Sequence, residues 1–240
     1  MNKIVKFLLL AVFAMSSVNL WGDDKEYVVG TNAEYPPFEY LEDGEIKGFD
    51  PELIQLLSEK VGFKYKWANM NFDGLIPAIQ TNKIDIVIAG MSITPEREKA
   101  VLFSMPYLTS KTAFVTNKKN PIKGLDDLEN KTYGAELGTT KEATARKING
   151  AEVVPFSNNT AALIALKNGR VDGIVMDESV AINYAESNPE DLLYVGAVDG
   201  EPKAIGFNKA STELKEKIDA AIQELIDDGT IEKLKEKYGI

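Results

Sequence analysis

Hydrophobic and polar residues in the first half of the chain follow a strand–helix–strand–helix order. Short runs with β-branched residues or period-two alternation predict strands at 27–31, 63–67 and 84–89. Apolar residues spaced three or four apart predict a helix that Asp50 caps, with Pro51 at its first position. Further helices are predicted at 72–81 and from Pro95, with Thr94 as the cap. This order predicts a largely parallel sheet with helices on both faces.

A second series of the same kind begins after about residue 110. Its predicted strands cover 112–115, 132–135, 171–176 and 204–207. Its predicted helices cover 125–128, 140–147, 160–167, 213–227 and 231–238. Two such series in one chain predict an α/β protein with two small lobes. Because no long flexible linker separates them, we expect a stiff hinge.

The N-terminal residues have the pattern of a secretory signal. Lys3 and Lys6 precede the apolar run Phe7–Met15, and Leu20–Gly22 offers a cleavage site before Asp23. The run is too short to span a bilayer, which needs about 20 apolar residues. We therefore expect residues 1–22 to be a signal peptide and the mature chain to lie outside the cytoplasm.

Composition excludes several classes of function. The chain has no cysteine and no histidine, so thiolate or imidazole zinc sites, Ser–His or Cys nucleophiles and lipid attachment through cysteine are excluded. Its formal net charge of −10 and its lack of a basic run argue against nucleic acid as a partner. We expect no metal and no cofactor. The missing lipid attachment site favours the periplasm.

Charged residues at the predicted strand ends supply the candidate chemistry, since ligands of open α/β sheets bind beyond the carboxyl ends of strands. Arg97 lies in the first turn of a helix, where the dipole disfavours a cation unless the guanidinium grips a carboxylate. Ser92 offers a hydroxyl beside it. The alternatives are an exposed helical arginine and a turn-capping serine.

Asp177 ends a strand of buried character, where a carboxylate needs a cationic partner such as a ligand ammonium. Capping of the next helix is the alternative. Gly138, Thr139 and Thr140 form a turn whose amides could meet a carboxylate, or a plain capped turn.

Two aromatic side chains, Tyr35 and Phe72, are candidates to sandwich an aliphatic or guanidinium side chain of a ligand. The alternative for both is core packing.

Several long motifs resemble those of the polar amino-acid-binding proteins of ABC transporters, the bacterial extracellular solute-binding proteins of family 3. The matching stretches lie within about 26–240 and include GTNAEYPPFEY, GEIKGFDPELI, GMSITPER, GTT, NGRVDGIVMDE and DDGTIEKLKEKYG. The resemblance implies a two-lobed type II flytrap with crossings near 107–111 and 199–203. Lobe 1 would comprise 23–109 plus 202–240, and lobe 2 would comprise 110–201.

The resemblance also implies roles for individual residues. Arg97 matches the carboxylate-binding arginine, Asp177 the ammonium-binding aspartate, and Thr140, after Thr139, the amide donor of the second lobe. Ser92, with the carbonyls of Ala89 and Gly90, matches the hydroxyl contact. Tyr35 and Phe72 match the aromatic walls. Positions that vary with ligand specificity match Asn32, Glu136, Lys141 and Met176.

Ligand preference depends on Glu136. An added carboxylate favours arginine, lysine or ornithine, although Asn32 stands where an acidic residue is common in the family. In the alternative, Lys141 neutralises Glu136 and Asn32 recognises a neutral amide such as glutamine, because a buried carboxylate needs a partner.

The expected function is capture of a free, preferably cationic, L-amino acid for an ABC transporter permease, by a monomer. An enzyme resembling cyclohexadienyl dehydratases, with Glu136 as general acid, is the rival class. A receptor's sensory domain is a weaker rival, because we expect no transmembrane or signalling segment after Ile240.

Overall fold

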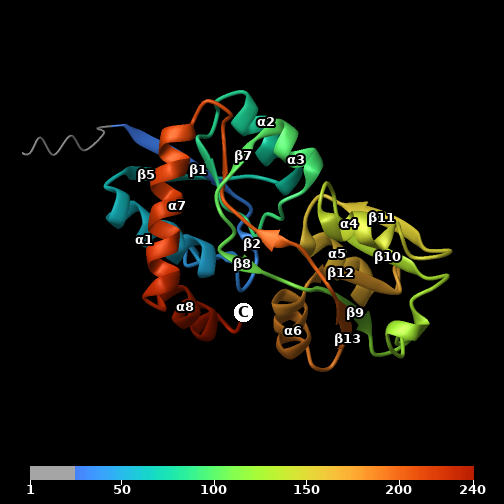
Figure 1. The fold of residues 1–240 in the computed structure, drawn as a ribbon. Helices are drawn as coiled ribbons and strands as arrows, with labels where there is room; N and C mark the ends of the chain where they lie inside the picture. The colour runs from blue at the N-terminus through green and yellow to red at the C-terminus, as the bar shows by residue number, and fades with distance from the viewer. Residues whose placement is uncertain (1–24) are drawn as a thin grey trace, which may run out of the picture.

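The computed structural model describes residues 25–240 and shows two lobes, each built around a five-stranded sheet with helices on its faces (Figure 1). The predicted signal peptide at 1–22 lies outside the described residues. Within 25–240, no helix has the length and apolar composition needed to cross a membrane.

In the lobe 1 sheet, four strands run in one direction and one strand runs antiparallel to both of its neighbours. Its order is β5 (Lys64–Asn69), β1 (Glu26–Thr31), β6 (Ile86–Val87), β15 (Gly206–Phe207) and β7 (Leu102–Phe103). The predicted parallel order holds for β5, β1 and β6. Since β15 belongs to the chain that returns from lobe 2, it enters the sheet in the opposite direction.

Five helices cover this sheet, most of them close to their predicted ranges. They are α1 (Phe49–Val61), α2 (Leu75–Gln80, after a 3₁₀ turn at Phe72–Gly74), α3 (Pro95–Ala100), α7 (Thr212–Asp227) and α8 (Thr230–Tyr238). The cap predicted for α3 is confirmed, because Thr94 Oγ1 accepts from the Arg97 N–H. The cap predicted for α1 is wrong. Gly48 precedes that helix, and Asp50 lies in its first turn with its carboxylate accepting the Gly90 N–H.

A small three-stranded antiparallel sheet, absent from the sequence prediction, lies between β1 and α1 in the chain. It consists of β2 (Glu34–Tyr35), β3 (Glu39–Glu42) and β4 (Glu45–Lys47). Its strands are two to four residues long, too short to give a periodic signal. It carries Tyr35 and Glu39 to the side of lobe 1 that faces lobe 2.

The lobe 2 sheet repeats this plan. Its order is β11 (Glu152–Phe156), β10 (Thr132–Glu136), β12 (Gly173–Asp177), β9 (Thr112–Asn117) and β13 (Leu192–Val198). The first three strands are parallel, whereas β9 is antiparallel to both of its neighbours. The strand that enters from the other lobe is again the reversed one.

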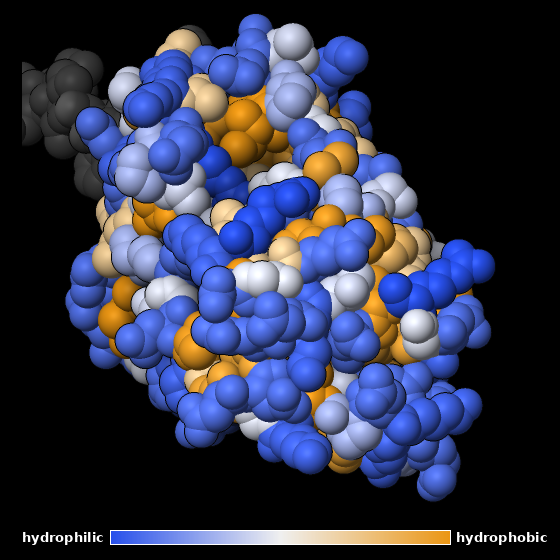
Figure 2. All heavy atoms as spheres, turned by 90° about the vertical axis from the view of Figure 1, so that its right-hand side faces the viewer, coloured by the Kyte–Doolittle hydropathy of each residue, from blue (hydrophilic) through white to orange (hydrophobic). Residues whose placement is uncertain are grey.

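Three helices and a short 3₁₀ turn accompany this sheet. They are α4 (Thr140–Ala145), α5 (Asn159–Lys167), α6 (Glu178–Ser187) and the turn at Leu125–Asp127. The outer face of the molecule on this side is mostly hydrophilic, with separated hydrophobic patches (Figure 2). Ala162 and Leu166 of α5 and Val180 and Ala181 of α6 are buried in the hydrophobic core, whereas Ile164 and Ile182 are exposed.

Two short strands connect the lobes and pair with each other. Strand β8 (Leu108–Thr109) leads into lobe 2, and β14 (Pro202–Lys203) leads back. They are antiparallel, with Lys203 opposite Leu108. An isolated antiparallel β-bridge between Ser92 and Lys203 extends this pairing to the segment that contains the candidate site residue Ser92. The exact lobe limits at 109/110 and 201/202 stay a prediction.

Candidate functional site

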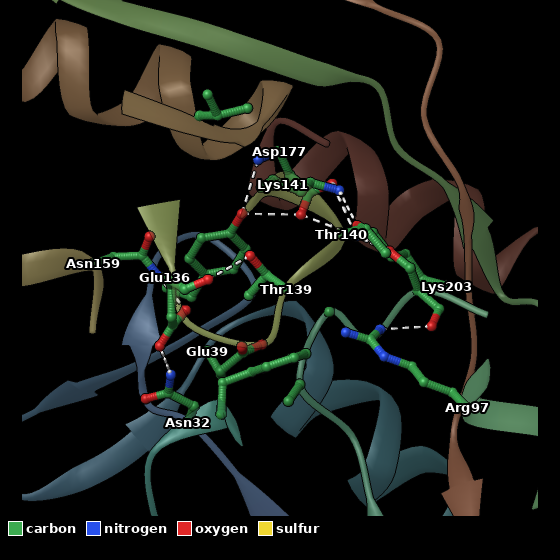
Figure 3. Close-up of a pocket in the computed structure, with 16 residues that line it drawn as sticks. Asn32, Glu39, Arg97, Glu136, Thr139, Thr140, Lys141, Asn159, Asp177 and Lys203 are labelled. Atoms are coloured by element: carbon green, nitrogen blue, oxygen red, sulfur yellow. Dashed lines mark hydrogen bonds and ion pairs between the residues drawn. The ribbon is translucent and has the colours of Figure 1, made fainter. Parts of the chain in front are cut away.

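The carboxyl ends of strands in both lobes face a shared cavity of about 390 Å³, a volume that includes its open side. All predicted site residues except Met176 line it: Asn32, Tyr35, Phe72, Ala89, Gly90, Ser92, Arg97, Glu136, Thr139, Thr140, Lys141 and Asp177. Four further residues line the cavity but were not predicted from the sequence to do so: Glu39, Asn159, Val175 and Lys203. Arg97 enters this cavity from one side, and Asn32 and Glu136 from the other (Figure 3).

Met176 does not reach the cavity. It is 1% exposed and packs in the hydrophobic core. Side chains alternate along a strand, so Val175 and Asp177 share the cavity side of β12 while Met176 points to the opposite side. The prediction for Met176 neglected this alternation.

The guanidinium of Arg97 is fixed by contacts from both lobes. Nη1 donates to the Ser92 carbonyl at 2.7 Å, and Nη2 donates to the Gly138 carbonyl of lobe 2 at 3.0 Å. The guanidinium carbon lies 5.1 Å from the centre of the Phe72 ring. Burial lowers the pKa of Arg97 to about 10, so the group is charged at neutral pH. Since arginine has five N–H donors, three remain for a ligand carboxylate.

Asp177 is surrounded by donors. Lys141 Nζ lies 2.8 Å from Oδ1, and Lys203 Nζ lies 2.9 Å from both carboxylate oxygens. The Tyr35 hydroxyl donates to Oδ2 at 2.9 Å and accepts the Asp177 N–H at 2.8 Å. Asp177 makes no side-chain cap to α6, so the capping alternative is wrong.

The environment of this cluster favours the charged form of Asp177 but disfavours the charged form of Lys203. Burial opposes the charge of Asp177, but the nearby charges of Lys141 and Lys203 outweigh it and hold the Asp177 pKa well below its ordinary value. Burial, against the opposing charge of Asp177, lowers the pKa of Lys203. A carboxylate with two lysines is thus the electrostatic centre of the cavity.

Glu136, the last residue of β10, accepts hydrogen bonds from two amides in different lobes. Asn32 Nδ2 donates to Oε1 at 2.5 Å, and Asn159 Nδ2 donates to Oε2 at 2.6 Å. The alternative in which Lys141 neutralises Glu136 is wrong, because Lys141 turns to Asp177 and lies 3.5 Å from Glu201. Glu136 therefore faces the cavity with neutral hydrogen-bond partners.

The pKa of Glu136 is raised to about 7. Burial is the main cause; the amides of Asn32 and Asn159 oppose it, and the charges of Glu34 and Asp73 add to it. A cation placed beside this carboxylate would lower its pKa again. The group is thus suited to a positively charged ligand side chain.

The floor of the cavity is shaped by two buried acids of lobe 1. Asp50 Oδ2 holds the Gly90 N–H at 2.7 Å, which keeps Gly90 at a φ of +49° beside the rings of Tyr35 and Phe38. Burial, with the charge of Asp50, raises the pKa of Glu39 well above its ordinary value. Position 90 therefore favours glycine, because a side chain there would be strained.

Ser92 and Thr140 approach each other across the lobes, with their hydroxyl oxygens 3.3 Å apart. Together with Arg97 they form the side of the cavity that can hold an anion. Among residues 25–240, no cluster of three or more acidic side chains is arranged to hold a metal ion. The site therefore offers charge complementarity to a small polar molecule.

A family model described as bacterial extracellular solute-binding proteins, family 3, matches residues 27–240. The chain is 37% identical over 213 residues to a probable histidine-binding protein of Campylobacter jejuni, covering 88% of this chain and 83% of that protein. It is 36% identical over 221 residues to the arginine-binding extracellular protein ArtP of Bacillus subtilis, covering 89% and 86%.

The structure is similar to that of an ancestral arginine-binding protein, solved with arginine and separately with glutamine. The TM-score is 0.84 and the identity 43%, covering 89% of this chain and 97% of that one. This similarity confirms the predicted two-lobed type II architecture.

Proposed function

Because this chain belongs to the bacterial extracellular solute-binding proteins of family 3, we propose that it closes around a free cationic L-amino acid, with arginine as the best candidate. One observation carries the proposal. Arg97, Asp177 and Glu136 line a single cavity and can meet a carboxylate, an ammonium and a cationic side chain. Relatives named for arginine or histidine binding support the same ligand class.

Contacts from both lobes give the closing mechanism. Tyr35 with Asp177, Asn32 with Glu136, and Arg97 with the Gly138 carbonyl all join lobe 1 to lobe 2. A ligand that touches the same groups stabilises the closed form over the open one, and only this difference shifts the population. We propose that the closed form of the exported, monomeric protein is recognised by an ABC transporter permease.

The direct test is calorimetric titration of refolded protein with the twenty amino acids and ornithine. Refolding removes any ligand that co-purifies. Tightest binding of arginine, lysine or ornithine supports the proposal. Tightest binding of glutamine would instead support the neutral alternative, which the glutamine complex of the ancestral arginine-binding protein also makes worth testing.

Replacement of Glu136 with glutamine is expected to weaken arginine binding about 10-fold or more, because hydrogen bonds to charged groups are worth about 1.5–3 kcal/mol. Titration of the variant with arginine and with glutamine measures the effect. Glutamine affinity serves as the control and should change little. Equal arginine affinity in the wild type and the variant would contradict a role for Glu136 in side-chain recognition.

Arginine binding is expected to weaken about 10-fold between pH 8 and pH 6, because a Glu136 pKa of about 7 leaves the ionised form scarce at the lower pH. The sign follows from the charge: the cation binds the ionised carboxylate, so protonation competes with it. Titrations at several pH values measure the slope. In Glu136→Gln the slope should flatten; the same slope in that variant would assign it to another group.

The rival enzyme class is tested by incubating the purified protein with prephenate. We propose binding rather than catalysis, since Arg97 and Asp177 provide the opposite charges that a zwitterion requires. Turnover of prephenate would contradict this choice.

A further inference from the structure

Side chains of the protein already contact the carboxylate of Asp177, which is the group expected to bind the ligand ammonium. Lys141 contacts Oδ1 of Asp177, Lys203 contacts both oxygens, and Tyr35 donates to Oδ2. Lys203 and Tyr35 hydrogen-bond to Oδ2, whereas Oδ1 is buried and accepts no hydrogen bond, although both lysine Nζ atoms lie within 2.9 Å of it. The charge of Asp177 is thus already paired with two lysines, so an arriving ammonium competes with them for this carboxylate (Figure 3).

The three side chains differ in what they could do after leaving. Tyr35 also accepts the Asp177 N–H, which fixes its hydroxyl at this point. Lys203 is 1% exposed, and its other hydrogen bond goes to the Ser92 hydroxyl at 3.0 Å. Departure of Lys203 from Asp177 would leave a buried charge facing a neutral group, which is costly.

Lys141 has a second carboxylate within reach. Its Nζ lies 3.5 Å from Glu201 Oε2, and the Glu201 side chain is 33% exposed, so part of it meets water. Glu201 Oε2 also accepts from the Thr140 hydroxyl at 3.2 Å, which holds it beside Lys141. Lys141 can therefore leave Asp177 and keep a counter-charge.

We propose that Lys141 is a tethered cation that competes with the ligand ammonium for Asp177 and moves to Glu201 when an amino acid binds. Lys141 is thus a specificity-determining residue that reduces the advantage of ligands with an α-ammonium. The inference rests on the proposed function, because it takes an α-amino acid as the ligand.

The test compares Lys141→Met with the wild type against two ligands, arginine and 5-guanidinopentanoate, which is arginine without its α-ammonium. The variant should bind arginine about 10-fold more tightly, since the competing charged contact is gone. Its affinity for 5-guanidinopentanoate should change by less than about twofold, because that ligand leaves Lys141 in place. Equal changes for both ligands, or no change for arginine, would overturn the proposal.

The move to Glu201 is tested with Glu201→Gln, alone and combined with Lys141→Met. Alone, Glu201→Gln should weaken the binding of arginine about 5-fold, because the displaced Lys141 loses its charged partner. In the Lys141→Met background it should have no effect. The same loss in both backgrounds would show that Glu201 acts through Thr140 and would overturn this step.

Failure of the proposed function is separable from failure of this inference. If the wild type binds glutamine but no basic amino acid, the cationic assignment fails. The same comparison is then made with glutamine and glutaramate, which is glutamine without its α-ammonium. Tighter binding of glutamine alone by Lys141→Met would still support the competition, and equal changes would overturn it.

Discussion

Asp177→Asn is expected to lower the free energy of unfolding by about 3–5 kcal/mol and to remove measurable amino-acid binding. The change leaves Lys203, which is 1% exposed, without the carboxylate that it contacts, while Lys141 keeps only Glu201 at 3.5 Å. Breaking a buried ion pair by removing one partner costs this much, because the remaining charge stays uncompensated. The ligand ammonium loses the same carboxylate. Urea unfolding and calorimetric titration measure the two effects.

A matched control is Glu224→Gln, which breaks the exposed pair of Glu224 with Lys60. Surface pairs contribute about 0–1 kcal/mol, so unfolding should be nearly unchanged in this variant. Similar unfolding energies for Asp177→Asn and Glu224→Gln would show that the buried lysines do not depend on Asp177.

Arg97→Met is expected to weaken arginine binding about 100-fold or more, since losing one partner of a buried, hydrogen-bonded charge pair costs about 2–5 kcal/mol. Arg97→Lys keeps the charge but lacks the planar fork, so we expect an intermediate loss. Calorimetric titration of both variants measures the series. Agmatine, which is arginine without its carboxylate, serves as the control ligand.

Agmatine separates two explanations of that loss. Arg97 also donates to the Gly138 carbonyl and lies over Phe72, so its removal could simply loosen the closed form. If Arg97 holds the ligand carboxylate, agmatine affinity should fall far less than arginine affinity. An equal loss for both ligands would assign the effect to the contacts between the lobes.

From β-branched or alternating runs, the sequence predicts β1, β5 and β6 of lobe 1 and β10 and β12 of lobe 2, but it misses β11, the third parallel strand of the lobe 2 sheet. It misses α6, in which only Val180 and Ala181 are buried, and β13, an edge strand with several exposed residues. It also predicts a longer strand at 84–89, whereas β6 covers only Ile86–Val87; Asp85 and Ile88 at its ends still donate backbone hydrogen bonds to β1. An apolar run in the sequence indicates that a segment is buried, but it does not indicate which neighbouring strand the segment pairs with or over how many residues.

Glu136 and Asp177 directly follow predicted strands, and Arg97 lies in the first turn of the helix after the strand predicted at 84–89; all three line one cavity. Ionic pairing is harder to predict, because Lys141 is close to Glu136 in sequence but meets Asp177 in space. Asn159 begins a helix, which is an ordinary position for asparagine, and so attracts no notice. Lys203 carries a weak signal: it is an isolated lysine directly before the apolar segment 204–207.

Lys203 lies on the short ribbon of β8 and β14 that joins the lobes, and its side chain reaches Asp177. A rotation of one lobe against the other about this ribbon would displace Lys203 less than residues far from the ribbon. The side chain that contacts Asp177 in the cavity is thus also part of the connection between the lobes. A substitution at Lys203 would therefore affect both ligand binding and the relative orientation of the lobes.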